Sequence, residues 1–192
     1  MFICGVRRRR RLLLVSGSLR AGSTNSAVLR TAQAIAPAAL EATIYVGLRD
    51  LPHFDPDDDR EPLAPAVAFM RAQVRRADAL LFSVPEYAGA LPGSFKNMLD
   101  WTIGDDQPGS IYEKPVAWIN ASPRGAARAH ESLRVVLGYA HAEIVEVACA
   151  HIPITAADVD DVGVVGSPSL RAEIAGVLER LDEHLVAKDD AA

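Results

Sequence analysis

The chain has 192 residues, of which 49% are hydrophobic and 23% are charged, and it carries a formal net charge of −5. This length suits one domain whose core is large enough to fold without disulfides or structural metals. The small acidic excess argues against nucleic acid as the main partner, because no surplus of basic side chains is left to neutralise phosphates. Apolar runs fall well short of the roughly 20 residues that a membrane-spanning helix needs. We therefore expect neither a nucleic-acid nor a membrane partner.

The chain begins with a basic lead-in, residues 1–11, whose last five positions are arginines. The apolar run that follows, residues 12–15, is shorter than the roughly 7–15 apolar residues of a secretory signal, so we expect a cytoplasmic protein. The arginines are compatible with contact to an anionic surface, but a solvated approach to the first strand is favoured. Cys4 and Cys149 show no metal or redox spacing and are interpreted as ordinary thiols. Residues 188–192 are expected to form a frayed tail.

Short apolar runs alternate with amphipathic stretches along the chain. The apolar runs predict five strands, the first of which (LLLV) is apolar at every position and is therefore expected to be buried on both faces. The strands are expected at residues 12–15, 42–46, 79–84, 116–119 and 144–148. The amphipathic stretches predict helices at residues 26–35, 66–76, 94–101, 126–138 and 169–187. This alternation predicts a single α/β domain over residues 1–192, with a parallel sheet covered by helices on both faces.

Three unusual loops follow three of the predicted strands, at the sheet edge where ligands of parallel α/β proteins bind. The first, residues 16–25, places hydroxyls, an amide and an arginine between a buried strand and a helix start, with Thr24 or Asn25 as the expected N-cap. Backbone N–H groups at a helix start bind phosphate. The loop lacks the P-loop pattern and the dinucleotide fingerprint, which favours a monophosphate held without a metal. An ordinary helix cap with extra polar residues is the alternative.

The second and third loops offer surfaces for a flat ligand. In the second, residues 85–101, prolines fix the backbone and glycines allow it to approach a ring closely. Trp101 at its end is expected in the core or an interface rather than against a cofactor. In the third, residues 120–129, Arg124 and Arg128 are candidates for a second phosphate, although a solvated helix start explains Arg128 as well.

No metal site is predicted. Residues 55–59 are rich in Asp but lack the glycine and glutamate positions of an EF-hand loop, so a solvated acidic loop is favoured. The five histidines show no spacing typical of metal ligands. His130 lies near the third loop, and a structural role is favoured for it.

Together the three loops resemble the NADPH-dependent FMN reductase family of the flavodoxin-like superfamily. The resemblance is carried by GSLRAGSTN at residues 17–25, PEYAGALPGSFKNMLDW at 85–101 and SPRGAARA at 122–129. It implies a flavodoxin-like three-layer sandwich with a five-stranded parallel sheet of order 2-1-3-4-5. It also implies FMN as cofactor, NADPH or NADH as electron donor, and quinones, azo compounds, chromate or free flavin as acceptors. Family members form homodimers or homotetramers, so the same is expected here.

The resemblance also implies which residues bind the cofactor. The FMN phosphate falls on the first loop and the isoalloxazine between the second and third. The expected cofactor-binding residues are Ser16, Ser18, Arg20, Ser23, Asn25, Pro85, Glu86, Tyr87, Ala88, Gly89, Ser122 and Gly125. No catalytic side chain is expected, because FMN itself carries the hydride. Many members have Asn where this chain has Ala88, so one hydrogen bond to the flavin ring is expected to be missing.

Two other functions stay open at this point: an electron carrier without turnover, and a non-catalytic flavin-binding protein. Flavodoxins usually stack aromatic side chains on both faces of the ring, whereas Tyr87 is the candidate here, so an open face and enzymatic turnover are favoured. An open face predicts ping-pong kinetics, with the nicotinamide and then the acceptor using the same space.

Overall fold

A computed structural model describes residues 8–191 of the chain. Its centre is a parallel sheet of β1 (Arg10–Ser16), β2 (Leu40–Ile44), β3 (Ala79–Ser83), β4 (Pro115–Asn120) and β5 (Glu143–Ile144), in the order β2-β1-β3-β4-β5. A sixth strand, β6 (Ala150–His151), pairs with β4. The interior strands β3 and β4 are buried at every position, as a parallel sheet covered on both faces requires. The predicted strand order is confirmed.

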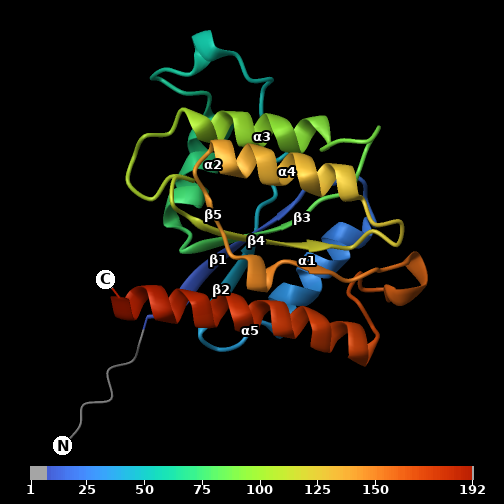
Figure 1. Ribbon diagram of the computed structural model, residues 1–192. Helices are drawn as coiled ribbons and strands as arrows, with labels where there is room; N and C mark the ends of the chain where they lie inside the picture. The colour runs from blue at the N-terminus through green and yellow to red at the C-terminus, as the bar shows by residue number, and fades with distance from the viewer. Residues whose placement is uncertain (1–7, 192) are drawn as a thin grey trace, which may run out of the picture.

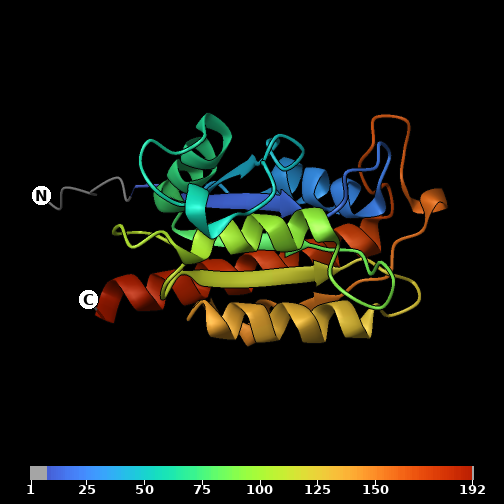
Figure 2. The same ribbon diagram turned by 90° about the horizontal axis from the view of Figure 1, so that it is seen from above.

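Within the described residues, five α-helices cover the sheet in two layers. They are α1 (Thr24–Ile35), α2 (Pro65–Arg76), α3 (Gly93–Ile103), α4 (Ala127–Tyr139) and α5 (Pro168–Ala191), with short 3₁₀ turns at Pro56–Asp58, Glu146–Ala148 and Ala156–Asp158. Figure 1 shows α2, α3 and α4 above the sheet and α1 and α5 below it. Figure 2 shows the strand arrows pointing to one end of the molecule, opposite the two termini. The predicted flavodoxin-like three-layer sandwich is confirmed.

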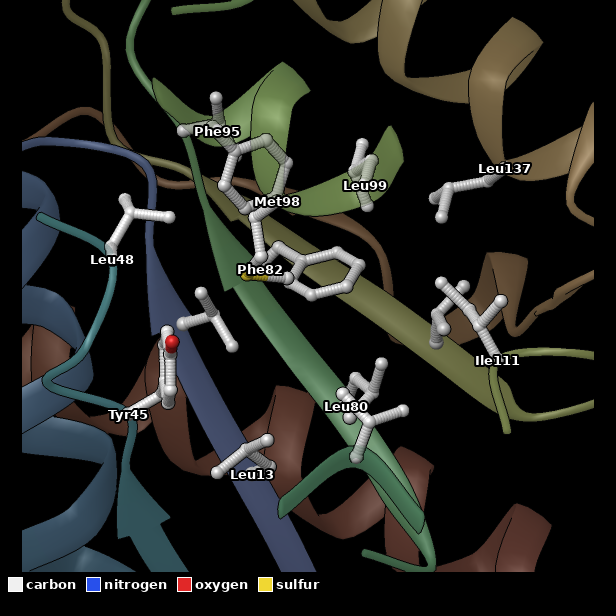
Figure 3. Packing of buried hydrophobic residues seen from close by; sticks show 14 of the residues in the cluster. Leu13, Tyr45, Leu48, Leu80, Phe82, Phe95, Met98, Leu99, Ile111 and Leu137 are labelled. Atoms are coloured by element: carbon white, nitrogen blue, oxygen red, sulfur yellow. The ribbon is translucent and has the colours of Figure 1, made fainter. Parts of the chain in front are cut away.

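Successive strand residues feed two separate cores. Leu13, Leu80 and Phe82 pack toward α2, α3 and α4, whereas Leu12 and Leu14 pack toward α1 and α5. Figure 3 shows the first core, where the rings of Phe82 and Phe95 meet edge to face at 5.3 Å between centroids. Trp101 is only 1% exposed and lies in this core, as expected. The apolar stripe of α5 lies in the second core and consists of Ile174, Val177, Leu178, Leu181 and Leu185.

The prediction of a strand at residues 144–148 is wrong for most of these residues. β5 ends at Ile144, and a 3₁₀ turn follows before β6 begins. Val116 pairs with Ile144 in β5, and Ile119 pairs with Ala150 in β6. Three residues of β4 therefore lie opposite six residues of the chain that runs from β5 to β6. The extra residues leave the ladder as a turn whose Val147 carbonyl accepts a hydrogen bond from Arg180 on α5. Tertiary packing therefore overrides the local apolar run.

Both ends of the described chain are more ordered than the sequence suggests. Arg10 is buried in β1 and forms an ion pair with Asp182 on α5, so the lead-in is only partly solvated. The expectation of a frayed tail is wrong for residues 188–191, because α5 continues to Ala191. Lys188 holds this last turn through an ion pair with Glu143, 2.5 Å between Nζ and Oε2.

Other sequence expectations meet mixed outcomes. The acidic run is exposed at Asp55, Asp57 and Asp58, but Asp59 pairs with the buried Arg71 at 2.7 Å. Burial raises the pKa of the Cys149 thiol to about 11, so this thiol stays protonated at neutral pH; Cys4 lies outside the described residues. Within residues 8–191, no helix is long and apolar enough to cross a membrane.

Candidate functional site

The three loops after β1, β3 and β4 surround one cavity of about 510 Å³. Its lining residues are Ser18, Arg20, Ser23, Thr24, Asn25, Pro85, Glu86, Tyr87, Ser122, Pro123, Arg124 and Ala126. The volume lies within the range of roughly 300–1,000 Å³ that small-molecule sites occupy. A larger cavity of about 620 Å³ lies around Arg71 and Arg75, but Asp59 and Asp105 already pair with these arginines. The cavity at the strand ends is therefore the better candidate.

Short polar contacts and one close approach shape the first loop. The Ser16 hydroxyl lies 3.0 Å from that of Ser26 and accepts the N–H of Ser18 at 3.2 Å, so it orders the loop without lining the cavity. The Gly17 N–H donates to the Ser83 carbonyl at 2.9 Å. A Cβ at Gly17 would lie 2.8 Å from a methyl carbon of Val84, so only glycine fits here. The loop is thus fixed to the end of β3.

The start of α1 presents hydrogen-bond donors to the cavity. Ser23 occupies the N-cap position, not Thr24 or Asn25 as expected, and its side chain makes no capping bond. Asn25 is buried, and its side-chain oxygen lies 3.0 Å from the Ser83 hydroxyl, whose single proton it shares with the Ile119 carbonyl at 2.9 Å. That contact leaves the amide nitrogen to donate to a ligand. Together with Arg20, these groups form a set of donors at the positive end of a helix, which suits a phosphate.

A tight hairpin in the second loop holds Tyr87 at the cavity. The N–H groups of Tyr87 and Ala90 each donate to the other residue's carbonyl at 3.1 Å. Between them, Ala88 and Gly89 have φ values of 51° and 75°, the left-handed pair of a type I′ turn. The cavity lining includes Tyr87, which is 50% exposed, but neither Ala88 nor Gly89. These two residues shape the turn.

Ala88 is a poor residue for its conformation, so we expect its replacement to stabilise the hairpin. Asn and Gly are the residues that a type I′ turn favours, and an L-residue such as Ala is strained at positive φ. Ala88→Asn and Ala88→Gly should each raise the free energy of unfolding by about 0.5–1 kcal/mol. Chemical denaturation of the ligand-free protein measures this effect. Equal or lower stability in both variants would show that the turn is not strained.

Side chains from two strands brace the third loop. Asn120 on β4 donates to the Gly125 carbonyl and accepts the Ser122 N–H at 3.0 Å. His151 on β6 lies 2.8 Å from the Ser122 carbonyl. Gly125, with φ of 89°, forms the turn rather than the cavity wall, while Ser122 lines the wall as expected. Sequence reasoning did not place Thr24, Pro123, Arg124 and Ala126 among the cofactor-binding residues, although the loop that carries each of them was identified.

His130 lies beneath the third loop with one ring nitrogen unpartnered. Its Nδ1 is 2.9 Å from the Ala126 carbonyl, and its buried Nε2 has no hydrogen-bond partner among the described residues. Burial is the largest influence on the pKa of His130 and lowers it; the hydrogen bond to the Ala126 carbonyl, which raises the pKa, comes next, followed by His151, which lowers it, and Glu86, which raises it. A neutral imidazole is therefore favoured in the folded protein.

This lowered pKa predicts a loss of stability in acid. The unfolded state binds a proton at an ordinary histidine pKa of about 6.5, whereas the folded state resists protonation until lower pH. Stability due to His130 is therefore complete above about pH 6.5 and declines as the pH falls toward the lowered pKa. His130→Gln should make unfolding less pH-dependent between about pH 7.5 and 5.5, and His53→Gln, at an exposed position, should not. Thermal melts across this range measure both, and parallel curves for wild type and His130→Gln would contradict the assignment.

The cavity lining is of two kinds. The first loop and the start of α1 contribute hydroxyls, an amide and Arg20, whereas Pro85, Tyr87, Pro123 and Ala126 from the other two loops provide flatter and less polar walls. The two kinds meet where the Tyr87 hydroxyl lies 3.5 Å from the Ser18 hydroxyl. A ligand that carries both a phosphate and a planar ring fits this lining. A parallel sheet of order 2-1-3-4-5 with such a cavity at its carboxyl edge defines a flavodoxin-like α/β protein.

Comparisons with known proteins agree with this class. The NADPH-dependent FMN reductase family matches residues 10–157. A quinone reductase of Escherichia coli K12 is 38% identical over 132 residues, which cover 67% of this chain and 69% of that protein. An NAD(P)H-dependent FMN reductase of Pseudomonas aeruginosa is 39% identical over 130 residues, covering 66% of this chain and 69% of that protein. The structure of FerB, a flavoenzyme NAD(P)H:(acceptor) oxidoreductase from Paracoccus denitrificans, superposes with a TM-score of 0.76 at 25% identity, covering 91% and 98% of the two chains.

The chain belongs to the NADPH-dependent FMN reductase family. It is therefore an oxidoreductase of the flavin type, with FMN as its flavin and NAD(P)H as its electron donor.

Proposed function

We propose that the cavity holds FMN as a cofactor and that the chain passes electrons from NAD(P)H to small acceptors, with quinones the first class to test. The observation that carries this proposal is the convergence of three separate loops on one cavity, with hydrogen-bond donors from the first loop and flatter walls from the other two. Similarity to a quinone reductase supports the choice of acceptor. Azo compounds, chromate and free flavin are further candidates, because one exposed ring face suits them all.

We assign the residues by their place in the cavity. Ser18, Arg20, Ser23 and Asn25 would hold the phosphate, and Pro85, Glu86, Tyr87 and Ser122 would surround the isoalloxazine. Ser16, Ala88, Gly89 and Gly125 would act indirectly, since they shape the loops behind the lining. Bound FMN would supply the hydride chemistry, and the protein would supply binding, orientation and electrostatics.

One face of the ring should stay open. Tyr87 is the aromatic side chain in the lining, and half of its surface is exposed. Donor and acceptor would then occupy the same space in turn, which requires the oxidised nicotinamide to leave before the acceptor enters. Initial rates against both substrates test this order: parallel lines support it, and intersecting lines reject it.

Two arginines are proposed to favour NADPH over NADH. Arg124 lines the cavity. The Arg128 guanidinium lies beside the hairpin, close enough to Gly89 that a Cβ at that position would be 3.5 Å from it. A guanidinium on the extra phosphate of NADPH would give a charge-assisted hydrogen bond. Replacing both with Ala should lower the ratio of kcat/KM for NADPH to that for NADH by about tenfold. Arg76→Ala, at an exposed position on α2, is the control, and an unchanged ratio in the double variant would reject this role.

Assembly and location are also proposed from the family resemblance. We propose a cytoplasmic homodimer or homotetramer. Light scattering on the FMN-saturated protein measures the mass directly, and a mass equal to one chain at micromolar concentration would reject the assembly.

A visible spectrum tests the central proposal. Purified protein with added FMN should show flavin bands near roughly 370 and 450 nm that stay with the protein on gel filtration. Anaerobic NADPH should bleach these bands. Retained flavin that NADPH cannot reduce would point to an electron carrier fed by another protein. Failure to retain flavin at all would overturn the cofactor role of FMN.

A further inference from the structure

Helix α4 begins without a capping side chain of its own. Its N-cap residue is Ala126, which lies in the left-handed region with φ of 44° and has no side chain that accepts a hydrogen bond. The first N–H groups of a helix have no partner within the helix, so they need acceptors from elsewhere. Ala126 also lines the cavity, so the start of α4 is part of the cavity wall.

Glu86 in the second loop supplies one missing acceptor. Its Oε2 accepts the N–H of Ala129, the third residue of α4, at 3.2 Å. A carboxylate at this point also interacts favourably with the positive end of the helix. The two residues are 43 positions apart in the sequence, so this bond links the second loop to a helix start that is distant from it along the chain.

This bond connects the second loop to the start of α4, and both of these segments contribute residues to the cavity lining. Asn120 and His151 hold the third loop to β4 and β6, whereas Glu86 holds the start of α4 to the hairpin that carries Tyr87. Tyr87 and Ala126 line the same cavity, so a change in the distance between these two segments changes the width available to a planar ring.

We infer that Glu86, besides lining the cavity, is a positioning residue for the flavin ring, acting through Ala129 to set the distance between the second and third loops. The inference rests on the proposed function, because it assumes that the ring lies between these loops. It assigns Glu86 a role as hydrogen-bond acceptor rather than as a charge. Glu86→Gln, which keeps a side-chain oxygen but loses the charge, should therefore preserve most of the effect.

Binding of FMN and of lumiflavin, which has the ring without the phosphate, tests this role. Glu86→Ala should raise both dissociation constants by the same factor, about three- to tenfold, which corresponds to roughly the free energy that one N-terminal helix cap contributes. Glu86→Gln should stay within about twofold of wild type. Glu131→Ala, on the exposed side of the same helix, should change neither constant. Hydrogen exchange at the Ala129 amide, measured by NMR without ligand, should accelerate in Glu86→Ala alone.

Each alternative outcome has a distinct meaning. Faster exchange at Ala129 and a lower melting temperature with unchanged flavin binding would reduce Glu86 to an ordinary helix cap and overturn the inference. If Glu86→Gln and Glu86→Ala lost flavin affinity equally, the charge of Glu86 and not its role as a hydrogen-bond acceptor would be responsible, and the inference would be overturned. Wild-type protein that binds neither FMN nor lumiflavin would overturn the proposed function, and the inference with it. Wild-type binding that Glu86→Ala leaves unchanged would overturn the inference alone.

Discussion

Replacing Asn25 with Asp should weaken FMN binding by about 100-fold while changing riboflavin binding by no more than about threefold. Asn25 is 7% exposed, and its oxygen lies 3.0 Å from the Ser83 hydroxyl. Asp has the same shape and keeps that acceptor, so the connection between α1 and β3 survives. The amide N–H₂ that we propose faces the FMN phosphate would be replaced by a negatively charged oxygen, which would repel it. Riboflavin lacks the phosphate and should not meet this repulsion.

The control is Gln33→Glu, the same amide-to-acid change at an exposed position farther along α1. It should leave both dissociation constants unchanged. Titrations followed by flavin fluorescence measure all three proteins. An equal loss of FMN and riboflavin binding would reject the proposed position of the phosphate at the start of α1.

The position of the cavity could be predicted because it depends on topology. Parallel strands end at the same edge of a sheet, so polar loops after residues 12–15, 79–84 and 116–119 had to meet there. Leu12 to Val15 read as a fully buried strand because no position in the run is polar. Eight of the twelve expected residues line the cavity: Ser18, Arg20, Ser23, Asn25, Pro85, Glu86, Tyr87 and Ser122.

The remaining features depend on contacts that local sequence does not encode. The run from Ile144 to Ala148 has the same apolar pattern whether it forms a strand or leaves the ladder, and packing of α5 decides in favour of a turn. The left-handed backbone of Ala88 is set by the cross-strand bonds of its hairpin, since Ala has no preference for that conformation. The bond from Ala129 to Glu86 exists only after two loops have been brought together.

Phe82→Ala should cost about 3–5 kcal/mol of unfolding free energy, the usual range for removing a buried aromatic ring. Phe82 is fully buried near the carboxyl end of β3, where it pairs with Val15 in the ladder on one side and Trp118 on the other. Its ring also meets that of Phe95 on α3 (Figure 3). The cavity left behind is bounded by two strands and a helix, so it cannot collapse easily. For a domain of this size the melting temperature should fall by about 6–20 °C.

Phe69→Ala is the matched control, because Phe69 on α2 is 49% exposed and loses far less contact. It should cost no more than about 1 kcal/mol. Denaturant unfolding of ligand-free protein compares the two variants without interference from flavin binding. Because Phe82 precedes Ser83, whose hydroxyl holds Asn25, the Phe82→Ala variant should also bind FMN more weakly in its folded state. If Phe82→Ala cost as little as Phe69→Ala, β3 would not be the rigid centre that positions the cavity, and the binding loops would have to be held by their mutual contacts instead.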